Sequence, residues 1–298
     1  MGTTVFEGAY TALVTPFNRD GSVDYGRLRA LIAAQAEAGV DGIAPVGSTG
    51  ESATLDYKEH DEVIAVSCEA ARGRLKVIAG TGSNATAEAL ELTRRAREAG
   101  ADATLQVTPY YNRPSQEGLY RHFSAIADLG LPVVLYNIPI RTGREIAVDT
   151  VARLARHPNI VAIKEAGGVV ERVGEILGRC SLTVLSGDDA LTLPMMTVGA
   201  KGVISVASNV VPAEIARMVR FALRADWDRA RRIQDRYNRL FTVLFLDTNP
   251  VPVKAALAMM GQIEEVYRLP LCPMEETLRH QLRDCLKGLN LIEEDKGP

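Results

Sequence analysis

Short apolar runs alternate with longer amphipathic stretches along most of the chain. The amphipathic stretches, such as YGRLRALIAAQAEAG and ATAEALELTRRAREAG, carry apolar residues every three or four positions and end at Gly39 and Gly100, which is typical of helices. The apolar runs between them predict buried strands. The eight runs are TALVTPF, GIAPVGST, KVIAGTG, ATLQVTPYY, PVVLYNIP, IVAIKEAG, LTVLSGDD and GVISVASN.

This pattern is a β–α unit repeated eight times. Strands that are apolar on both faces indicate a parallel sheet covered by helices. Eight units in about 210 residues favour an α/β fold, a closed (β/α)8 TIM barrel. An open, doubly wound sheet is the alternative that the pattern leaves open.

The strand pattern stops after residue 209, and the rest of the chain predicts helices over 212–223, 227–246, 250–260 and 274–286. We expect the first of these helices to close the barrel. The prediction is therefore a catalytic barrel domain over residues 1–224 and a C-terminal helical domain over residues 225–298. No low-complexity linker separates the two, so the helical domain should pack on the barrel or on a neighbouring subunit.

Composition narrows the class of function. With 47% hydrophobic and 24% charged residues and a formal net charge of −3, the chain has no basic footprint for nucleic acid or for an anionic membrane. No apolar run reaches the length of a membrane span, and the start, MGTTVFEGAYTALVTPF, lacks the regions of a signal peptide. We expect a cytoplasmic protein that acts on small molecules.

The sequence carries no recognisable cofactor motif. Its four cysteines and four histidines are scattered, without the spacing of a zinc site or a disulfide framework, so we predict no metal. The segment GTGSNA at 80–85 lacks the third glycine of a dinucleotide fingerprint. The sequence therefore supports no nicotinamide or nucleotide site.

Polar residues gather where the predicted strands end. The loops after the strands of such a barrel form the face on which active sites are built. We expect these residues to converge on one pocket there. They are Thr15, Ser48, Thr49, Thr81, Tyr110, Tyr111, Tyr136, Asn137, Lys164, Glu165, Asp188, Asp189, Ser205 and Ser208.

Lys164 interrupts the apolar run IVAIKEAG. It shares strand parity with Ile160 and Ala162, so all three side chains are expected on one side, at the barrel mouth. Desolvation disfavours an ammonium ion, and a neutral amine can attack a ketone to form a Schiff base. A lysine that extends its stem into solvent or pairs with a nearby acid explains the same pattern.

Three further features strengthen the case for a site at this mouth. Tyr136 ends the preceding strand, where its phenol would lie beside Lys164 and exchange protons, although buried tyrosines commonly bond a backbone carbonyl instead. Arg141 offers a planar fork for a carboxylate, although an exposed loop arginine often has no role. The turn GSTGES at 47–52 has hydroxyls and backbone N–H groups for a small anion, but these are also ordinary turn residues.

Seven segments taken together resemble one enzyme family. They are GSTGESATL, IAGTGSNATAEA, VTPYYNRPSQEGLY, LYNIPIRTG, IKEA, LSGDD and GVISVASN, and in this order they resemble the bacterial dihydrodipicolinate synthase family of pyruvate-dependent class I aldolases. The resemblance extends from about residue 6 to residue 290 and includes NPVPVKAAL. It implies a (β/α)8 barrel with a C-terminal helical domain, usually a homotetramer built from tight dimers.

The resemblance also implies a reaction. The family condenses pyruvate with L-aspartate 4-semialdehyde to give 4-hydroxy-tetrahydrodipicolinate, in lysine and diaminopimelate biosynthesis, without a cofactor. Lys164 matches the Schiff-base lysine and Tyr136 the proton donor and acceptor. Ser48 and Tyr111 match the rest of a hydroxyl relay, with Tyr111 contributed across the dimer interface. The family usually has threonine at the position of Ser48, whose hydroxyl is retained.

Substrate and effector positions carry over in the same way. Thr49 and the Ile204 backbone match pyruvate-binding positions, Arg141 matches the residue that receives the semialdehyde carboxylate, and Gly187 lines the same pocket. A lysine feedback site is implied, although Tyr57 replaces a histidine of the inhibited type. In structural terms alone, Asn84 would cap a helix and His60 would be a solvated helix residue. The residues that match the effector site are Ser52, Ala53, His60, Asn84, Glu88 and Tyr110.

Two rival functions remain at this point. Another lyase of the superfamily, such as N-acetylneuraminate lyase or a keto-deoxy sugar-acid aldolase, would share the lysine and the tyrosine but take a different aldehyde. Arg141 and the segment YYNRPSQEGLY favour the synthase. A barrel that binds a keto acid without converting it is the second rival, and the intact set of reactive side chains opposes it.

Overall fold

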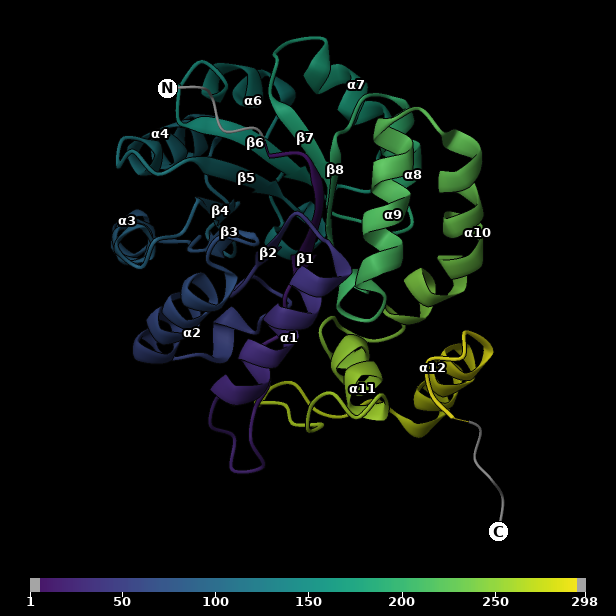
Figure 1. Cartoon of the computed structure of the whole chain (residues 1–298). Helices are drawn as coiled ribbons and strands as arrows, with labels where there is room; N and C mark the ends of the chain where they lie inside the picture. Colours follow the sequence, from purple (N-terminus) through teal and green to yellow (C-terminus); the bar gives the residue numbers. More distant parts are fainter. Residues whose placement is uncertain (1–5, 294–298) are drawn as a thin grey trace.

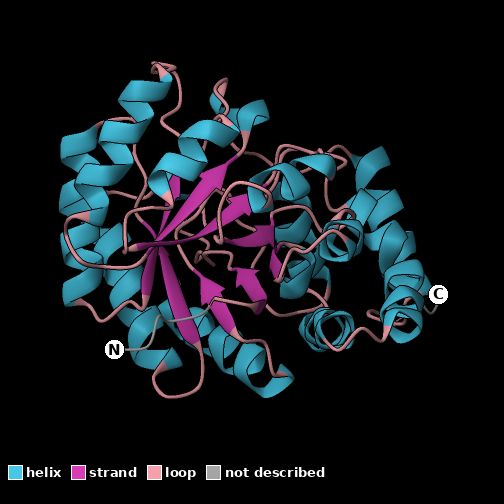
Figure 2. Cartoon of the chain, turned by 90° about the horizontal axis from the view of Figure 1, so that it is seen from above, coloured by secondary structure: helices cyan, strands magenta, loops and turns pink. Residues whose placement is uncertain are grey.

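The computed structural model describes residues 6–293 and shows a closed barrel of eight parallel strands in sequence order (Figures 1 and 2). The predicted TIM barrel is confirmed, and the open doubly wound sheet is excluded. The strands are β1 (Gly8–Ala12), β2 (Gly42–Ala44), β3 (Lys76–Gly80), β4 (Ala103–Val107), β5 (Val133–Asn137), β6 (Ile160–Glu165), β7 (Thr183–Ser186) and β8 (Gly202–Ser205).

The strands are shorter than the apolar runs that predicted them, and the first one is displaced. We predicted a strand over 11–17, but β1 is Gly8–Ala12 and pairs with β8 from Gly8 to Thr11. Pro16 has no backbone N–H for a ladder, so the apolar residues after Ala12 line a loop instead of continuing the sheet. The first strand therefore ends earlier in the sequence than its apolar run suggests. The loop that follows it starts correspondingly earlier.

Helices surround the barrel because each presents an apolar face to the strands. Local signals fix their ends: Asp56 forms a capping box with Glu59, and Gly39 adopts a left-handed φ of 78° where the first helix ends. The helices up to the last strand are α1 (Tyr25–Ala38), α2 (Tyr57–Ala71), α3 (Thr86–Glu98), α4 (Gln116–Ala127), α5 (Pro139–Thr142), α6 (Val148–Leu154), α7 (Glu171–Leu177) and α8 (Thr192–Thr197). Short 3-10 turns lie at η1 (Ser52–Thr54) and η2 (Ala207–Asn209).

Four helices follow the barrel strands, as predicted, with slightly different ends. They are α9 (Pro212–Leu223), α10 (Trp227–Val243), α11 (Val251–Met259) and α12 (Glu276–Gly288). The helix α9 contacts β1 and α1 and so closes the ring, while α10 packs on α9 and α12 contacts both α10 and α11. The division of the chain into domains at residue 224 stays a prediction.

The segment after α11 returns to the barrel. Figure 1 shows it running back beneath α1, beside the loop that precedes that helix. Arg268 of this segment donates hydrogen bonds to the Gly21 carbonyl in that loop, at 2.7 and 3.0 Å. The C-terminal part is therefore attached to the barrel at a point far from the α9–α10 connection.

Within residues 6–293, no helix is both long and apolar enough to cross a membrane.

Candidate active site

Lys164 and Tyr136 lie side by side at the carboxyl ends of two neighbouring strands. They are paired in the β5–β6 register, and both are nearly buried, at 5% and 6% exposure. The Lys164 Nζ lies 4.3 Å from the centroid of the Tyr136 ring. The lysine does not extend into solvent, so that structural explanation of its place in the strand is excluded.

The glutamate next to this lysine has a separate task. The Glu165 carboxylate is fully buried and accepts hydrogen bonds from Asn137 Nδ2 at 2.9 and 3.1 Å, from the Gly167 N–H at 2.7 Å and from Arg172 Nε at 2.9 Å. It thus joins β5, β6 and α7. Because its charge is matched by Arg172, it is no partner for Lys164. The expectation that Asn137 and Glu165 point into the pocket is wrong, since adjacent strand residues face opposite sides.

Gly187 makes room for the lysine stem. A Cβ at this position would lie 3.0 Å from Lys164 Cε and 2.7 Å from the Ala166 Cβ. Contacts this short require the neighbours to move. The backbone N–H of Gly187 also donates to the Glu165 carbonyl at 2.7 Å, which fixes the end of β7 against β6. Gly187 therefore borders Lys164 through its lack of a side chain, while its place in the substrate pocket stays a prediction.

A cavity of about 660 Å³ opens at this end of the barrel. It extends from the Tyr136 phenol to the first turns of α2 and α3. A volume of this size suits a ligand of metabolite size. Its polar lining includes Ser48, Glu51, Ser52, Tyr57, His60, Ser83, Glu88, Tyr110, Tyr136, Arg141 and Asn249.

The turn after β2 carries two hydroxyls, one of which lines the cavity. Ser48 lines it directly, and Thr49, which is buried, accepts a hydrogen bond from Asn249 Nδ2 at 3.0 Å. The turn is tight, because Val46 and Glu51 both adopt a left-handed φ of 55°. Such a conformation costs free energy in residues with a side chain, and the surrounding contacts must maintain it.

Arg141 stands at the cavity mouth, in the short helix α5. Its Nη2 donates to the backbone carbonyl of Asn249 at 2.9 Å, and the rest of the guanidinium is exposed. The guanidinium thus retains donors for a ligand carboxylate.

Ile204 is fully buried in β8, where its backbone pairs with Tyr10 of β1.

Tyr111 does not join the other predicted relay residues within this chain. Its side chain is 92% exposed, its φ of 70° is left-handed, and it is absent from the lining of the cavity. An exposed aromatic residue on a tight loop is typical of a contact with another molecule.

Several strand-end residues that we expected in the pocket are structural instead. Thr81 hydrogen-bonds to Thr93 at 2.9 Å and accepts from Gln106 at 2.7 Å, in a buried cluster beside α3. Thr15 donates to the Gly50 carbonyl at 2.7 Å. The prediction of one common pocket is wrong here, because strand-end side chains that face the helices are used to attach the loops. The same holds for Asp188, Asp189, Ser205 and Ser208, which bond the loops after β7 and β8.

The predicted effector residues gather around Glu88, at the far end of the cavity. Tyr57 donates to Glu88 Oε1 at 2.7 Å and Ser83 donates to Oε2, and these two bonds lower the pKa of the carboxyl, the bond from Ser83 most. The residue that replaces the expected histidine, Tyr57, therefore contacts the charged group that would bind an effector ammonium. Ser52, Ala53 and Tyr110 also line this end.

Two structural explanations for this region are wrong. His60 is buried, contacts the Gly80 carbonyl at 3.0 Å and lines the cavity, and burial lowers its pKa, so it is no solvated helix residue. Asn84 does not cap α3, because the N-cap position is Ala85 and carries no side-chain hydrogen bond. Asn84 itself is not among the residues that line the cavity.

Sequence reasoning missed the contribution of the segment before α11. Asn249 bridges Thr49 and Arg141, and Lys254 forms a fully buried ion pair with Glu51. One signal was present: a lysine inside the apolar helix VPVKAALAM.

Among residues 6–293, no three His, Cys, Asp or Glu side chains are grouped in a way that could hold a metal ion.

Comparison with known proteins decides the family. The model of the Dihydrodipicolinate synthetase family matches residues 5–289. The chain belongs to this family. A 4-hydroxy-tetrahydrodipicolinate synthase from Persephonella marina is 51% identical over 97% of this chain and 100% of its own length.

Solved structures of the dihydrodipicolinate synthetase family agree with the fold. The dihydrodipicolinate synthase from Aquifex aeolicus has a TM-score of 0.95 and 50% identity, covering 97% of this chain and 100% of its own. The enzyme from Cyanidioschyzon merolae, solved with lysine bound, has a TM-score of 0.94 and 45% identity, covering 96% and 99%. The predicted family, fold and activity as a 4-hydroxy-tetrahydrodipicolinate synthase, a lyase, are confirmed. The roles of single residues stay predictions.

Proposed function

We propose that the chain condenses pyruvate with L-aspartate 4-semialdehyde through a Schiff base on Lys164, giving 4-hydroxy-tetrahydrodipicolinate for lysine and diaminopimelate biosynthesis. One observation carries the assignment of the residue: a buried amine lies against the Tyr136 ring at the carboxyl end of the barrel, without a carboxylate partner in residues 6–293. An amine in such a place is suited to nucleophilic attack. The reaction needs no metal or organic cofactor.

The chemistry proceeds in balanced steps. The Lys164 amine adds to the pyruvate ketone carbon, and loss of water leaves an imine. A methyl proton is then removed, and the resulting enamine attacks the aldehyde carbon of the second substrate, whose oxygen takes up a proton. The amino group of that substrate finally attacks the imine carbon, which releases Lys164 and closes the ring.

Hydroxyl groups supply the proton transfers. Tyr136 and Ser48 both line the cavity, on β5 and on the turn after β2. We assign Tyr136 as the group that gives and takes protons at the reacting carbon and oxygen, and Ser48 as its neighbour in the relay. General acid–base catalysis of this kind contributes about 10²–10⁴-fold to a rate.

The third relay member, Tyr111, is assigned to a second copy of the chain. Its exposure of 92% leaves it outside its own cavity. A homodimer that inserts this phenol into the partner's site would complete the relay, and two such dimers would form the expected homotetramer. Ile140 of the neighbouring helix α5 is 90% exposed, which supports a contact surface on this side of the cavity.

The two substrates are assigned to different groups of residues. Thr49 and the Ile204 backbone are assigned to the pyruvate carboxylate, and Gly187 borders the same place. Arg141, exposed at the mouth and anchored by Asn249, is assigned to the carboxylate of the semialdehyde. A guanidinium binds a carboxylate with two parallel hydrogen bonds, which orients the aldehyde as well as attracting it.

Borohydride trapping tests the assignment. Treatment with pyruvate and sodium borohydride should add one reduced pyruvate per chain, and peptide mass mapping should place it on Lys164. Trapped mass on another lysine, or none, would contradict the proposal. A barrel that merely binds keto acids would also gain no covalent mass.

The second substrate is tested separately. Pyruvate with aspartate semialdehyde should give product, whereas sialic acid and keto-deoxy sugar acids should not be cleaved. Arg141→Ala should raise the KM for the semialdehyde and leave pyruvate trapping intact. Cleavage of sialic acid at a comparable rate would favour the sugar-acid lyases instead.

We further propose that L-lysine binds at the Glu88 end of the cavity and inhibits the enzyme. The support is a charged carboxylate with Ser52, Ala53, His60 and Tyr110 around the same space, together with Asn84, which matches the family pattern. Lysine titration of the activity checks this, and full activity at millimolar lysine would contradict it. Tyr57→His, which removes one bond to Glu88, should change the inhibition constant without changing kcat.

A further inference from the structure

An ion pair without solvent contact joins α11 to the turn after β2. The side chains of Glu51 and Lys254 are both fully buried, and they are hydrogen-bonded to each other. The Lys254 Nζ also lies 4.1 Å from the centroid of the Phe17 ring and 5.4 Å from that of Tyr267. The second carboxylate oxygen, Glu51 Oε2, is buried and has no hydrogen-bond partner.

Such a pair is a poor way to gain stability. Two charges lose their hydration on burial, and well-packed apolar side chains in their place are often as stable or more so. Burial lowers the pKa of Lys254, and the Glu51 carboxylate opposes that shift. The pair does provide geometric specificity, because a charged hydrogen bond fixes the position of one side chain relative to the other.

The pair is attached to the turn that carries the hydroxyls of Ser48 and Thr49. Glu51 follows Thr49 by two residues and has the left-handed φ of 55°. Its N–H donates to the Ser48 carbonyl at 3.2 Å, and the Ser52 N–H donates to the Gly47 carbonyl at 3.3 Å. The Glu51 side chain is therefore attached to the backbone unit that sets the positions of Ser48 and Thr49.

The other end of the pair lies one helical turn from Asn249, which also bonds the turn after β2. The Lys254 N–H donates to the Pro250 carbonyl at 3.0 Å, which places the lysine one helical turn after the start of α11. Asn249 immediately precedes that start and bonds Thr49 and Arg141. The segment 249–254 and the turn 48–51 are thus linked twice, once by a charged pair and once by a neutral hydrogen bond.

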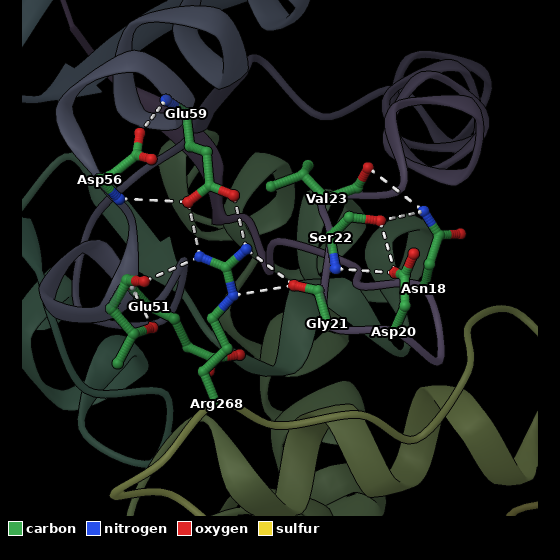
Figure 3. A network of polar contacts seen from close by, with 10 residues as sticks. Asn18, Asp20, Gly21, Ser22, Val23, Glu51, Asp56, Glu59 and Arg268 are labelled. Carbon is green, nitrogen blue, oxygen red and sulfur yellow. Dashed lines mark hydrogen bonds and ion pairs between the residues drawn. The ribbon is translucent and has the colours of Figure 1, made fainter.

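Arg268 makes a second set of contacts, which hold the chain at Thr54 and Glu59, just after this turn. Figure 3 shows the Arg268 guanidinium between the Glu59 carboxylate and the Gly21 carbonyl. It donates to both oxygens of Glu59 at 2.6 Å and to the Thr54 carbonyl at 2.8 Å. Arg268 fixes the base of α2. In the turn 48–51, Thr15 bonds the Gly50 carbonyl and Asn249 bonds Thr49, while Lys254 holds the Glu51 side chain.

We propose that Lys254 is a positioning residue of the synthase reaction, acting through Glu51 to hold Thr49 and Ser48 against the bound pyruvate. This inference rests on the function proposed above. It assigns a catalytic consequence to the C-terminal helices, which contribute no reacting group. Loss of the pair should weaken pyruvate binding and turnover more than it weakens the fold.

Four variants test the inference: Lys254→Met, Glu51→Gln, the double variant E51Q/K254M, and Glu51→Asp, which keeps both charges but shortens one arm. Each is compared with the wild type for thermal midpoint, KM and kcat with both substrates, and borohydride trapping. Arg279→Met is the matched control, because it removes the Arg279–Glu265 pair of the same C-terminal region, and neither residue of that pair lines the cavity.

We expect the pyruvate KM to rise about 10-fold or more in the variants, since a small misplacement of binding groups has large effects. The double variant should lose no more than the worse single variant, because both side chains act through one contact. Its trapped mass at saturating pyruvate should remain, and Arg279→Met should keep wild-type kinetics.

Normal KM and kcat in folded variants would overturn the inference, even if the thermal midpoint fell, because the pair would then serve stability alone. If Lys254→Met fails to fold, E51Q/K254M and Glu51→Asp still decide the question, since neither leaves an unpaired buried charge. Wild-type trapping is measured alongside. Its absence would reject the proposed function, whereas trapping with unaffected variants would reject only the role of Lys254.

Discussion

Two lysines are buried among residues 6–293, and they differ in one respect. Lys164 and Lys254 are 5% and 0% exposed, and each ammonium nitrogen lies just over 4 Å from an aromatic ring, 4.3 Å for Tyr136 and 4.1 Å for Phe17. Lys254 has a carboxylate partner in Glu51, whereas no carboxylate in residues 6–293 pairs with Lys164. The comparison teaches that burial alone does not make a lysine reactive. In the function proposed for Lys164, the missing counter-ion leaves the amine available to a ketone.

The largest expected effect separates the two lysines directly. Lys164→Arg should abolish borohydride trapping and lower kcat by at least about 10³-fold, since an arginine cannot form the imine. Lys254→Met should still be trapped at saturating pyruvate. Mass spectrometry of the two trapped variants is the measurement. Equal labelling of both would remove the distinction between them.

The next effect concerns the ring beside the reactive amine. Tyr136→Phe keeps the aromatic face but loses the hydroxyl, so the turnover number should fall by about 10²–10⁴-fold. Tyr10→Phe is the control, because the Tyr10 hydroxyl is buried in the barrel without a hydrogen-bond partner. A full-rate Tyr136→Phe enzyme would show that the ring only packs against the lysine.

A third buried base extends the comparison to stability. His122 packs against Phe123, and burial lowers its pKa to about 4. Between about pH 6.5 and pH 4 the unfolded chain binds a proton there that the folded chain does not. The free energy of unfolding should therefore decrease as the pH is lowered from about 6.5 to 4. The decrease due to His122 should be on the order of 3 kcal/mol.

Urea unfolding of the wild type and His122→Gln at several pH values measures that contribution. The variant should show a flatter dependence between pH 6.5 and pH 4. His60, whose pKa is also lowered by burial, remains in both proteins and accounts for part of the slope that is left. Identical slopes in the two proteins would show that His122 is protonated in the fold without cost.

The smallest effect concerns Ser48. Ser48→Ala removes one hydroxyl of the relay and should reduce kcat by about 10-fold, because a neighbouring phenol continues to act. Ser52→Ala, on the same turn, controls for a change of the loop. An unchanged turnover number in Ser48→Ala would refute the assigned role.

Much of the fold was predictable because local periodicity determines it. Alternating strands and helices, with Gly39 at a helix end, indicated the barrel, and the barrel in turn placed Tyr136 and Lys164 at one mouth. The family resemblance then supplied the substrates. The first strand was misplaced because Leu13 and Val14 are as apolar as the strand residues before them, and hydrophobicity does not distinguish a buried loop from a strand.

The remaining parts of the site depend on contacts between distant positions. Asn249 reaches Thr49, and Lys254 reaches Glu51, across about 200 residues of chain. No periodicity relates such pairs. Likewise, Thr81 was expected in the pocket because it ends a strand, but the side of the strand that it faces is set by the barrel's register. Sequence patterns therefore predicted the strand-end positions of Lys164 and Tyr136 better than the contacts that hold the turn 48–51.

Gly187 carries no functional group, yet a single added carbon there would collide with the stem of Lys164. A survey of substitutions would thus find this position among the least tolerant in the protein, alongside residues that touch the reacting atoms. Any redesign of the enzyme for larger keto acids has to keep that empty space, and seek its extra volume on another wall.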